Sequence, residues 1–344
     1  MKQLIFKSSI LVLTILVPLM SYNFYTDYFG VFHTKLTDRY NEPNMRFIKT
    51  RYIVNNPTKY SQFIFGSSRC GKILGNFYDS KVYNMYYSDG LPIEFYEDLK
   101  IFIENDVTVQ KVYIGLDEFS FKIIPSKHHS QLLRKRFHND FSNDLASYLQ
   151  FLIDPPKLKK VPFSIATTFD FENSGNPLHF EVDSLINASP ADHINDEKFN
   201  KPIFYHGNRA DKTIEEIMSL IRLCEKNNIE TIFFMNPIFI NTYTQYPIKD
   251  LHSIKRKISS ITNFYDFSGV TSVTTDRMNY YETSHYRYAI GDSIWNIISS
   301  PNASTKSTIY NHVSGQNVES LLELEKEMLL ILEEDHSEKS EANI

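Results

Sequence analysis

Cysteine is scarce in this sequence: only Cys70 and Cys224 occur among 344 residues, and they lie far apart. A disulfide framework or a zinc site needs several cysteines, or cysteines and histidines, at short spacings, so neither is predicted. We expect each cysteine to be a small buried hydrophobe. One disulfide between the two is the alternative in an oxidising compartment.

Metal-binding histidine patterns are missing as well. Histidines gather in residues 121–210, but they form no helical His-x-x-x-His pair and no histidine–carboxylate pattern; among them are His128, His129, His138, His193 and His206. A metal-dependent hydrolase is therefore not favoured, and no metal is expected.

The sequence also lacks an excess of positive charge. Its 36 Lys and Arg residues face 41 Asp and Glu residues, which gives a formal net charge of −5, and the two signs are dispersed. A nucleic-acid-binding protein needs a basic face to neutralise phosphates, so nucleic acid is not an expected partner. With 42% apolar and 22% charged residues, the composition is that of an ordinary globular protein.

One long apolar stretch stands at the N-terminus. Residues 8–26 are uncharged and follow Lys2 and Lys7, and a membrane helix tolerates the single Pro18. No small-x-small cleavage pattern follows, and aromatic residues of an interfacial kind come next: Tyr22, Phe24, Tyr25 and Tyr28. We expect residues 1–29 to be an uncleaved signal anchor with its start in the cytoplasm and the bulk of the chain outside. A cleaved signal peptide and a buried N-terminal helix are the alternatives.

Short apolar runs and helical patterns alternate through most of the chain. Strands are expected at 62–65, 82–85, 111–114, 230–235 and 263–267, and helices at 92–105, 213–227 and 248–260. Such alternation is typical of parallel βαβ units. It predicts an α/β domain over residues 30–300, with helices covering both faces of a parallel sheet.

Two segments depart from this alternation. Residues 121–210 are polar and rich in turn-forming residues, and we interpret them as an insertion or lid; their Arg134-Lys135-Arg136 run is expected to be a solvated helix face. Residues 301–344 are expected to be a linker followed by an amphipathic helix over 318–334. That helix either docks on the domain or binds a partner.

A serine pair follows the first expected strand. Gly66 ends the apolar run 62–65, and Ser67 and Ser68 come where a helix is expected to begin. Ligands of open parallel sheets bind at the carboxyl ends of the strands, where a helix start also offers N–H groups to an oxyanion. A reactive serine is expected here. The alternative is that one serine merely caps the helix.

A second segment offers the partners that a reactive serine needs. Glu282 stands three residues before His285, close to the end of the domain. A serine nucleophile requires a base to take its proton, and the base requires a carboxylate to hold its tautomer. A further serine, Ser293, lies in a Gly-Asp-Ser tripeptide, but within a helical pattern and with no strand before it, so we do not expect it to react.

Taken in order along the chain, four short segments resemble the blocks of the SGNH (GDSL-type) hydrolase superfamily. They are Gly-Ser-Ser-Arg at 66–69, Ser-Asp-Gly at 88–90, Gly-Leu-Asp at 115–117 and Glu-x-x-His-Tyr at 282–286. The membrane-anchored bacterial branch of that superfamily is the most similar, and the segment 25–30 also resembles it. The resemblance covers the chain from the anchor to about residue 299 and implies a three-layer, flavodoxin-like α/β fold.

The resemblance also implies roles for individual residues. Ser68 matches the nucleophile, His285 the general base and Glu282 the acid that orients it. The backbone N–H groups of Ser68 and Gly90 match two oxyanion-hole donors. No cofactor is expected for this chemistry.

One position departs from the family pattern. Asp117 stands where the family has asparagine, and an ionised aspartate offers no N–H to an oxyanion, so we expect Asp117 to orient another group. Arg69, next to the serine, is expected either to contact an anionic or polar substrate or to point into solvent.

Two functions follow as expectations. The first is a serine-dependent esterase or O-acyltransferase acting on acyl esters of a cell-envelope or exported polysaccharide, anchored to the membrane and facing the bacterial periplasm or cell surface. The second is a catalytically silent SGNH-like accessory protein that serves a membrane acyltransferase or an envelope assembly complex. Asp117 favours the second, whereas Ser68 together with Glu282 and His285 favours the first.

Overall fold

A six-stranded sheet forms the centre of the protein in the computed structural model, which describes residues 1–33, 41–125, 131–155, 169–172, 176–177, 180–300 and 308–341. The strand order is β2-β1-β3-β6-β7-β8; the strands are β1 Gln62–Phe65, β2 Val82–Asn84, β3 Lys111–Leu116, β6 Glu230–Met235, β7 Phe264–Asp266 and β8 Asn311–Val313. All neighbours pair in parallel except β7 and β8, which are antiparallel. The expected parallel sheet is confirmed for five strands, whereas β8 lies in the segment expected to be a linker.

The inner strands are apolar on both faces. Phe63, Ile64 and Phe65 of β1 are fully buried, and Ile64 pairs with Tyr113 of β3. Strands that are covered on both sides carry continuous apolar runs instead of an alternation, which is why these segments could be recognised. The shared register brings the carboxyl ends of β1 and β3 side by side.

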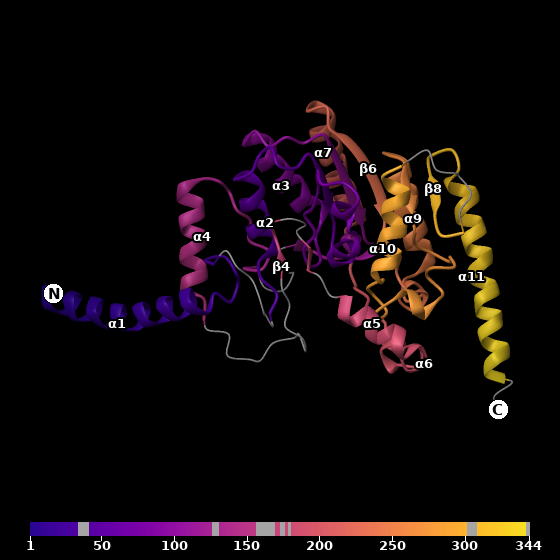
Figure 1. Cartoon of the computed structure of the whole chain (residues 1–344), viewed down its shortest axis with the longest axis horizontal. Coiled ribbons are helices and arrows are strands. Elements are labelled where there is room, and N and C mark those ends of the chain that lie inside the picture. The colour runs from indigo at the N-terminus through magenta and orange to yellow at the C-terminus, as the bar shows by residue number, and fades with distance from the viewer. Residues whose placement is uncertain are drawn as a thin grey trace.

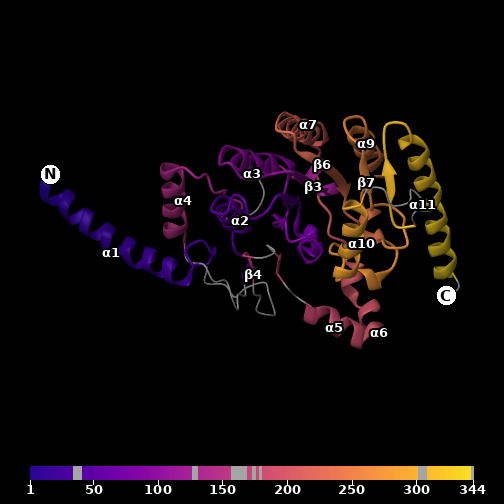
Figure 2. The same ribbon diagram turned by 45° about the horizontal axis from the view of Figure 1, so that its top comes forward.

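Helices cover both faces of the sheet, as expected from the alternating pattern. Helices α3 (Pro92–Glu104), α7 (Ala210–Lys226) and α9 (Ile248–Ser259) lie on one face, and α10 (Tyr288–Ile298) lies on the other (Figure 2). On the second face α10 contacts the short 3-10 helix η1 (Ser68–Lys72), which follows β1 directly. The connection after β1 and the helix after the last parallel strand therefore meet on one side of the sheet.

The segment 121–210 contributes several separate pieces. Helix α4 (Phe141–Ile153) lies near the N-terminal helix, while α5 (Phe180–Ala188) and α6 (Pro190–Ile194) lie below α10 (Figure 1). Two further short strands, β4 (Phe169–Asp170) and β5 (Asn176–Pro177), pair with each other. The expected solvated charge run is wrong for Arg134, which is buried because Glu94 and the carbonyls of Ser88 and Asp89 accept its hydrogen bonds.

The C-terminal helix α11 (Val318–Glu341) docks on the domain, which is one of the two expected outcomes. Glu325 of α11 accepts a hydrogen bond of 2.7 Å from Lys255 of α9, and Lys255 also pairs with Asp266 of β7 at 2.8 Å. Together with β8, this contact joins the segment after residue 300 to the sheet. Residue 300 is therefore not a structural boundary.

The N-terminal helix α1 (Lys2–Thr26) is long and apolar enough to cross a membrane. It extends away from the domain (Figure 1), and Asn23 is the one residue of α1 that is buried. The alternative of a buried N-terminal helix is therefore wrong. Both cysteines are buried and free, so the disulfide alternative is wrong as well, and Cys70 and Cys224 are the small buried hydrophobes that the sequence predicts.

Candidate active site

Ser68 stands at the carboxyl end of β1, as the first residue of η1. The neighbouring Ser67 is the capping residue, because its Oγ accepts a hydrogen bond of 3.2 Å from the N–H of Arg69. Ser67 is fully buried, whereas Ser68 is partly exposed. Capping therefore engages Ser67 and leaves the hydroxyl of Ser68 available. The helix expected at this point is a five-residue 3-10 helix.

The tight turn at Ser68 requires the glycine before it. A Cβ atom at Gly66 would lie 2.2 Å from Sγ of Cys70, a distance that real Cβ contacts do not reach. Cys70 itself is buried against Gly115 of β3, where a Cβ would lie 2.3 Å from the same sulfur. The two glycines thus allow η1 to fold back onto the strand ends and present Ser68 at the edge of the sheet.

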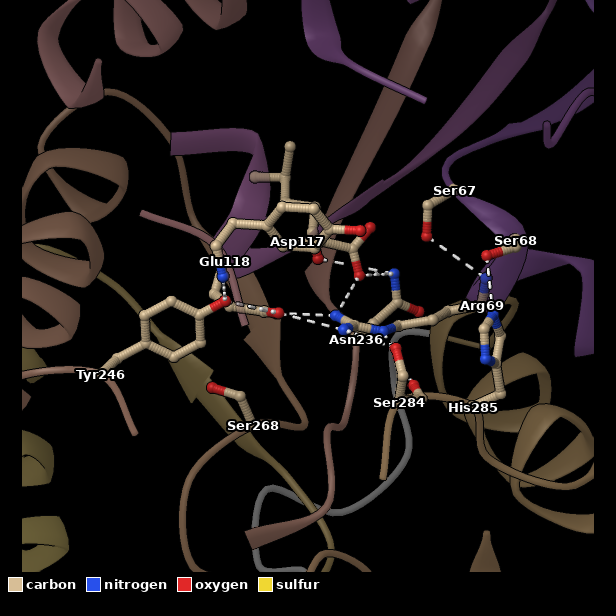
Figure 3. Close-up of polar contacts among 12 residues, drawn as sticks. Ser67, Ser68, Arg69, Asp117, Glu118, Asn236, Tyr246, Ser268, Ser284 and His285 are labelled. Atoms are coloured by element: carbon tan, nitrogen blue, oxygen red, sulfur yellow. Dashed lines mark hydrogen bonds and ion pairs between the residues drawn. The ribbon is translucent and has the colours of Figure 1, made fainter. Parts of the chain in front are cut away.

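Ser68, His285 and Glu282 form a continuous hydrogen-bonded chain. Ser68 Oγ lies 2.8 Å from His285 Nε2 (Figure 3), and His285 Nδ1 lies 2.5 Å from Glu282 Oε1. Because a carboxylate at this distance accepts a hydrogen bond, the imidazole carries its proton on Nδ1 and leaves Nε2 to accept from the serine. The structure thus brings together the three residues that the sequence analysis selected.

The carboxylate of Glu282 is held by its own backbone neighbours. It accepts hydrogen bonds of 2.8 Å from the N–H groups of Ser284 and His285. Burial acts to raise the pKa of Glu282, but the hydrogen bonds and the charge of His285 outweigh it and lower the pKa below its usual value. Glu282 therefore stays ionised and fixes both the tautomer and the orientation of His285.

The loop that carries His285 is fastened from two sides. The N–H of Tyr281 donates to the carbonyl of His285 at 2.8 Å. Two residues after the histidine, Arg287 donates hydrogen bonds of 2.6 Å to Asp183 and 2.7 Å to Asn187, both in α5. The segment 121–210 therefore supports the histidine loop through α5. Nothing in the sequence pattern singled out Asp183 for this role.

Arg69 links the turn that carries Ser68 to the loop that carries His285 through hydrogen bonds. Its side chain is 2% exposed, and each of its five N–H groups has an acceptor (Figure 3). Nε and Nη2 donate to the carbonyl and the hydroxyl of Ser284, at 2.9 and 3.1 Å. Asp117 accepts from Nη1 at 2.8 Å, and Glu118 accepts from Nη1 and Nη2 at 2.6 and 3.0 Å. The expectation that Arg69 points into solvent is wrong, and no N–H is left for a substrate.

Asp117 faces this arginine. Its Oδ1 also accepts a hydrogen bond of 3.2 Å from Asn236 at the end of β6. Burial raises the pKa of Asp117, while the positive charge of Arg69 acts to lower it. Asp117 therefore orients Arg69, and through it the backbone beside His285.

The oxyanion donors that the resemblance implies differ in availability. The N–H of Ser68 has no hydrogen-bond partner among the described residues. The N–H of Gly90 already donates to the carbonyl of Tyr87 at 3.2 Å, so this structure does not present it as a free donor. Gly90 instead allows close packing, because a Cβ there would lie 2.7 Å from the carbonyl oxygen of Gly66. Its turn supports the strand end that carries the serine.

A cation that the sequence analysis missed lies against two aromatic rings close to the histidine loop. Nζ of Lys72, the last residue of η1, lies 4.8 and 4.7 Å from the ring centroids of Tyr281 and Tyr288. Burial lowers the pKa of Lys72 to about 8, although the charges of Asp183 and Glu282 act in the opposite direction. Lys72 therefore places a titratable positive charge near Glu282.

The Gly-Asp-Ser tripeptide at 291–293 lies in α10, as expected. Ser293 donates its hydroxyl hydrogen to the carbonyl of Ala289 one turn earlier, at 2.9 Å. Gly291 has a packing role, since a Cβ there would lie 1.9 Å from the carbonyl oxygen of Lys72. The tripeptide thus lets α10 approach η1 and takes no part in the hydrogen-bonded chain of Ser68.

Within the described ranges, no three His, Cys, Asp or Glu side chains gather in a way that could hold a metal ion. No protein-family model and no curated protein sequence matches this chain. The chemistry of the site therefore has to be inferred from its own residues.

Proposed function

We propose that this protein is a serine-dependent esterase or O-acyltransferase that acts on acyl esters. The observation that carries the proposal is the chain of two hydrogen bonds, 2.8 Å from Ser68 to His285 and 2.5 Å from His285 to Glu282. A serine, a histidine and a carboxylate in this order are the groups that activate a hydroxyl for attack on a carbonyl. The serine and the histidine remain partly exposed, so a substrate can reach them.

The reaction has two halves. Ser68 Oγ attacks the acyl carbonyl carbon while His285 Nε2 takes the hydroxyl proton, and the resulting imidazolium returns that proton to the departing alcohol. This leaves an acyl group on Ser68. Water or a sugar hydroxyl then attacks the acyl-enzyme and gives its proton to His285, which hands it back to Ser68 as the product acid or ester leaves. Glu282 stabilises the imidazolium in both halves.

The oxyanion site bears on how fast such a reaction runs. The N–H of Ser68 is available for the developing negative charge, whereas Gly90 donates only after it releases the carbonyl of Tyr87. Asp117 presents no donor because it faces Arg69. A site with one ready donor favours slow turnover in hydrolysis and in transfer alike, because both pass through the same kind of oxyanion.

The architecture supports an SGNH-type domain in this proposal. The order β2-β1-β3-β6-β7 is that of doubly wound, flavodoxin-like sheets, in which ligands bind where the strand order reverses. Ser68 lies at that point, after β1. Helix α1 supports a membrane anchor, and the lysines before its apolar stretch favour a domain outside the cytoplasm. An acylated envelope or exported polysaccharide is then the substrate class that we propose.

A paired assay tests this function. The full chain in detergent is incubated with p-nitrophenyl acetate and, separately, with an acetylated oligosaccharide and a free acceptor sugar, and both acetate release and acetyl transfer are measured. We expect activity in wild type and in Ser293→Ala, and none in Ser68→Ala. A folded wild-type protein that neither releases nor transfers acetyl groups would overturn the proposal.

A second function is supported by one observation, the engaged N–H of Gly90 together with the carboxylate at Asp117. Both reduce oxyanion stabilisation, as expected of a catalytically silent accessory protein that serves a membrane acyltransferase. The two functions differ in one result. An accessory protein would support acylation in the cell equally well as wild type and as Ser68→Ala.

A further inference from the structure

Helix α4 (Phe141–Ile153) exposes a stripe of large apolar side chains. The stripe consists of residues four positions apart, which fall on one side of a helix, and their exposed fractions are 84%, 45%, 43% and 47% for Phe141, Leu145, Leu149 and Ile153. An exposed apolar patch of this extent is unusual where a protein faces water, and it marks a site of contact with another protein or with a membrane.

The opposite side of α4 is packed against the domain. Phe151 packs against Phe29 in a tilted arrangement and against Phe47 edge to face, with centroid distances of 5.4 and 5.5 Å. The only charged residue of α4, Asp144, is buried and accepts hydrogen bonds from the N–H groups of His138 and Asp140. The outer side of the helix thus combines large apolar residues with no charge at all.

The end of α4 is fixed to the end of α1. Asn23, the one buried residue of α1, donates hydrogen bonds of 2.7 and 2.8 Å to the carbonyls of Leu152 and Asp154, which end α4. Exposed aromatic side chains surround this joint on α1, namely Tyr22, Phe24 and Tyr25. Aromatic residues of this kind gather where a membrane helix leaves the bilayer.

Helices α1 and α4 lie crosswise to each other where they meet. In both views α4 stands across the end of α1, at the side of the domain from which α1 protrudes (Figures 1 and 2). When α1 crosses a bilayer, its last turn lies at the surface, and Asn23 then holds the end of α4 at the same level. The domain lies on one side of α4 (Figure 1). The apolar stripe lies on the side of the helix opposite the buried Asp144 and Phe151.

We infer that α4 lies on the bilayer surface and that the stripe Phe141, Leu145, Leu149 and Ile153 inserts into the boundary between headgroups and acyl chains. An uncharged apolar stripe beside a membrane span fits lipid, because the apolar area that an interfacial helix buries strengthens its binding to this layer. The occupant is therefore the lipid of the membrane that α1 crosses. The contact holds the catalytic domain in one orientation above the membrane instead of leaving it on a free tether.

This inference rests on the membrane anchoring in the proposed function and not on its serine chemistry. It is tested on the full chain in liposomes of neutral phospholipid. Because Cys70 and Cys224 are buried, an environment-sensitive maleimide dye reacts selectively with a single cysteine introduced on the surface. The dye is placed by Leu145→Cys or Leu149→Cys on the stripe, and quenching by nitroxide-labelled lipid is compared with quenching by iodide in the water.

Two control positions match these variants. Gln150 is exposed one residue after Leu149 and is rotated by about 100° around the helix, so the dye at Gln150→Cys leaves the centre of the stripe. Ser320 is exposed on α11, at the far end of the molecule from α1 (Figure 1), so Ser320→Cys reports full contact with water. Resistance to alkaline carbonate extraction shows whether α1 is inserted.

We expect the dyes at 145 and 149 to be quenched several-fold more by lipid than by iodide, with the opposite at 320 and an intermediate result at 150. With α1 inserted, iodide quenching at 145 and 149 equal to that at 320 would overturn the inference and leave the anchor intact. Shielding found in native membranes but not in liposomes would assign the stripe to a protein partner and overturn the lipid contact. Failure of α1 to insert would overturn the anchoring and this inference together, without bearing on Ser68.

Discussion

Ser68 and His285 are separated by 217 positions in the sequence, yet Ser68 Oγ lies 2.8 Å from His285 Nε2. The contact follows from the topology. Ser68 starts η1 directly after β1, and His285 comes shortly before α10, which contacts η1 on the same face of the sheet. Any change that separates α10 from η1 is therefore expected to separate the serine from its base.

Gly291 controls that approach. A Cβ at this position would lie 1.9 Å from the carbonyl oxygen of Lys72, and backbone cannot move as a flexible side chain does. Gly291→Ala is expected to lower the free energy of unfolding by about 2–3 kcal/mol, as overpacking does, and to slow any reaction of Ser68. Ser293→Ala in the same helix is the control, with an expected change within about 0.5 kcal/mol. Denaturant unfolding of both variants checks this, and equal stabilities would contradict the packing role.

Glu282 is expected to act through His285. Glu282→Gln keeps the size of the side chain but removes the charge that holds the imidazole tautomer, so the reaction rate of Ser68 should fall by about 10²–10⁴-fold. Glu282→Asp preserves the charge, so it should restore much of the rate if the shorter side chain reaches Nδ1. Rates are measured with the chromogenic ester. A Glu282→Gln variant as fast as wild type would show that His285 needs no carboxylate.

Arg69 is expected to hold the loop that carries His285 in place through its hydrogen bonds to Ser284, Asp117 and Glu118. Lysine keeps the charge but cannot reach Ser284, Asp117 and Glu118 together. Arg69→Lys should therefore slow the reaction of Ser68, while Arg69→Met, which leaves two buried carboxylates unpaired, should cost about 3–5 kcal/mol of unfolding free energy.

The control for Arg69 is an arginine in an exposed ion pair. Arg256 pairs with Glu319 at 2.7 Å, and the two side chains are 46% and 68% exposed. Arg256→Met is expected to change the free energy of unfolding by less than about 1 kcal/mol and to leave the reaction rate unchanged. If Arg69→Lys reacts as fast as Arg256→Met, Arg69 has a structural role and no positioning role.

Lys72 makes stability depend on pH. Its pKa is about 8 in the folded protein, below the 10.5 of a free lysine, because burial disfavours the charged form. Below pH 8 both states are protonated and the folded state carries the full cost of the buried charge. Between pH 8 and 10.5 the unfolded state binds more protons, so the stability contributed by this group rises with pH.

The variant Lys72→Met removes this cost. The variant is expected to be more stable than wild type at pH 7 by about 1–2 kcal/mol, a cost that is kept small because water screens the partly exposed charge. This difference in stability should shrink as the pH rises to 10. Denaturant unfolding at several pH values gives the difference. A difference that does not change with pH would show that Lys72 has an ordinary pKa in the folded protein.

Much of the fold could be predicted because it depends on local patterns. The buried strands β1, β3 and β6 are continuous apolar runs, and α3, α7 and α9 show helical spacing, so each was expected within a few residues of its observed bounds. Ser68, His285 and Glu282 were predicted from short motifs in a particular order along the chain. Their distances of 2.8 and 2.5 Å agree with that prediction.

The features that escaped prediction depend on contacts between distant segments. Strand β8 pairs with β7 although the sequence of β8 shows no strand pattern. The burial of Arg134 depends on hydrogen-bond acceptors in residues 88–94. Asp183 holds the histidine loop from 104 positions away in the sequence. The five-donor role of Arg69 also arises only when the ends of β1 and β3 meet the loop that carries Ser284.

The reactivity of Ser68 is the central question, and covalent labelling of the full chain with a fluorophosphonate probe tests it most directly. The probe phosphonylates a serine only when a base removes the hydroxyl proton, so the label reports activation without knowledge of the substrate. Wild type and Ser293→Ala are expected to be labelled on Ser68, and Ser68→Ala and His285→Ala are expected to remain unlabelled while folded. A folded wild-type protein without label, or equal labelling of His285→Ala, would contradict the proposed serine chemistry.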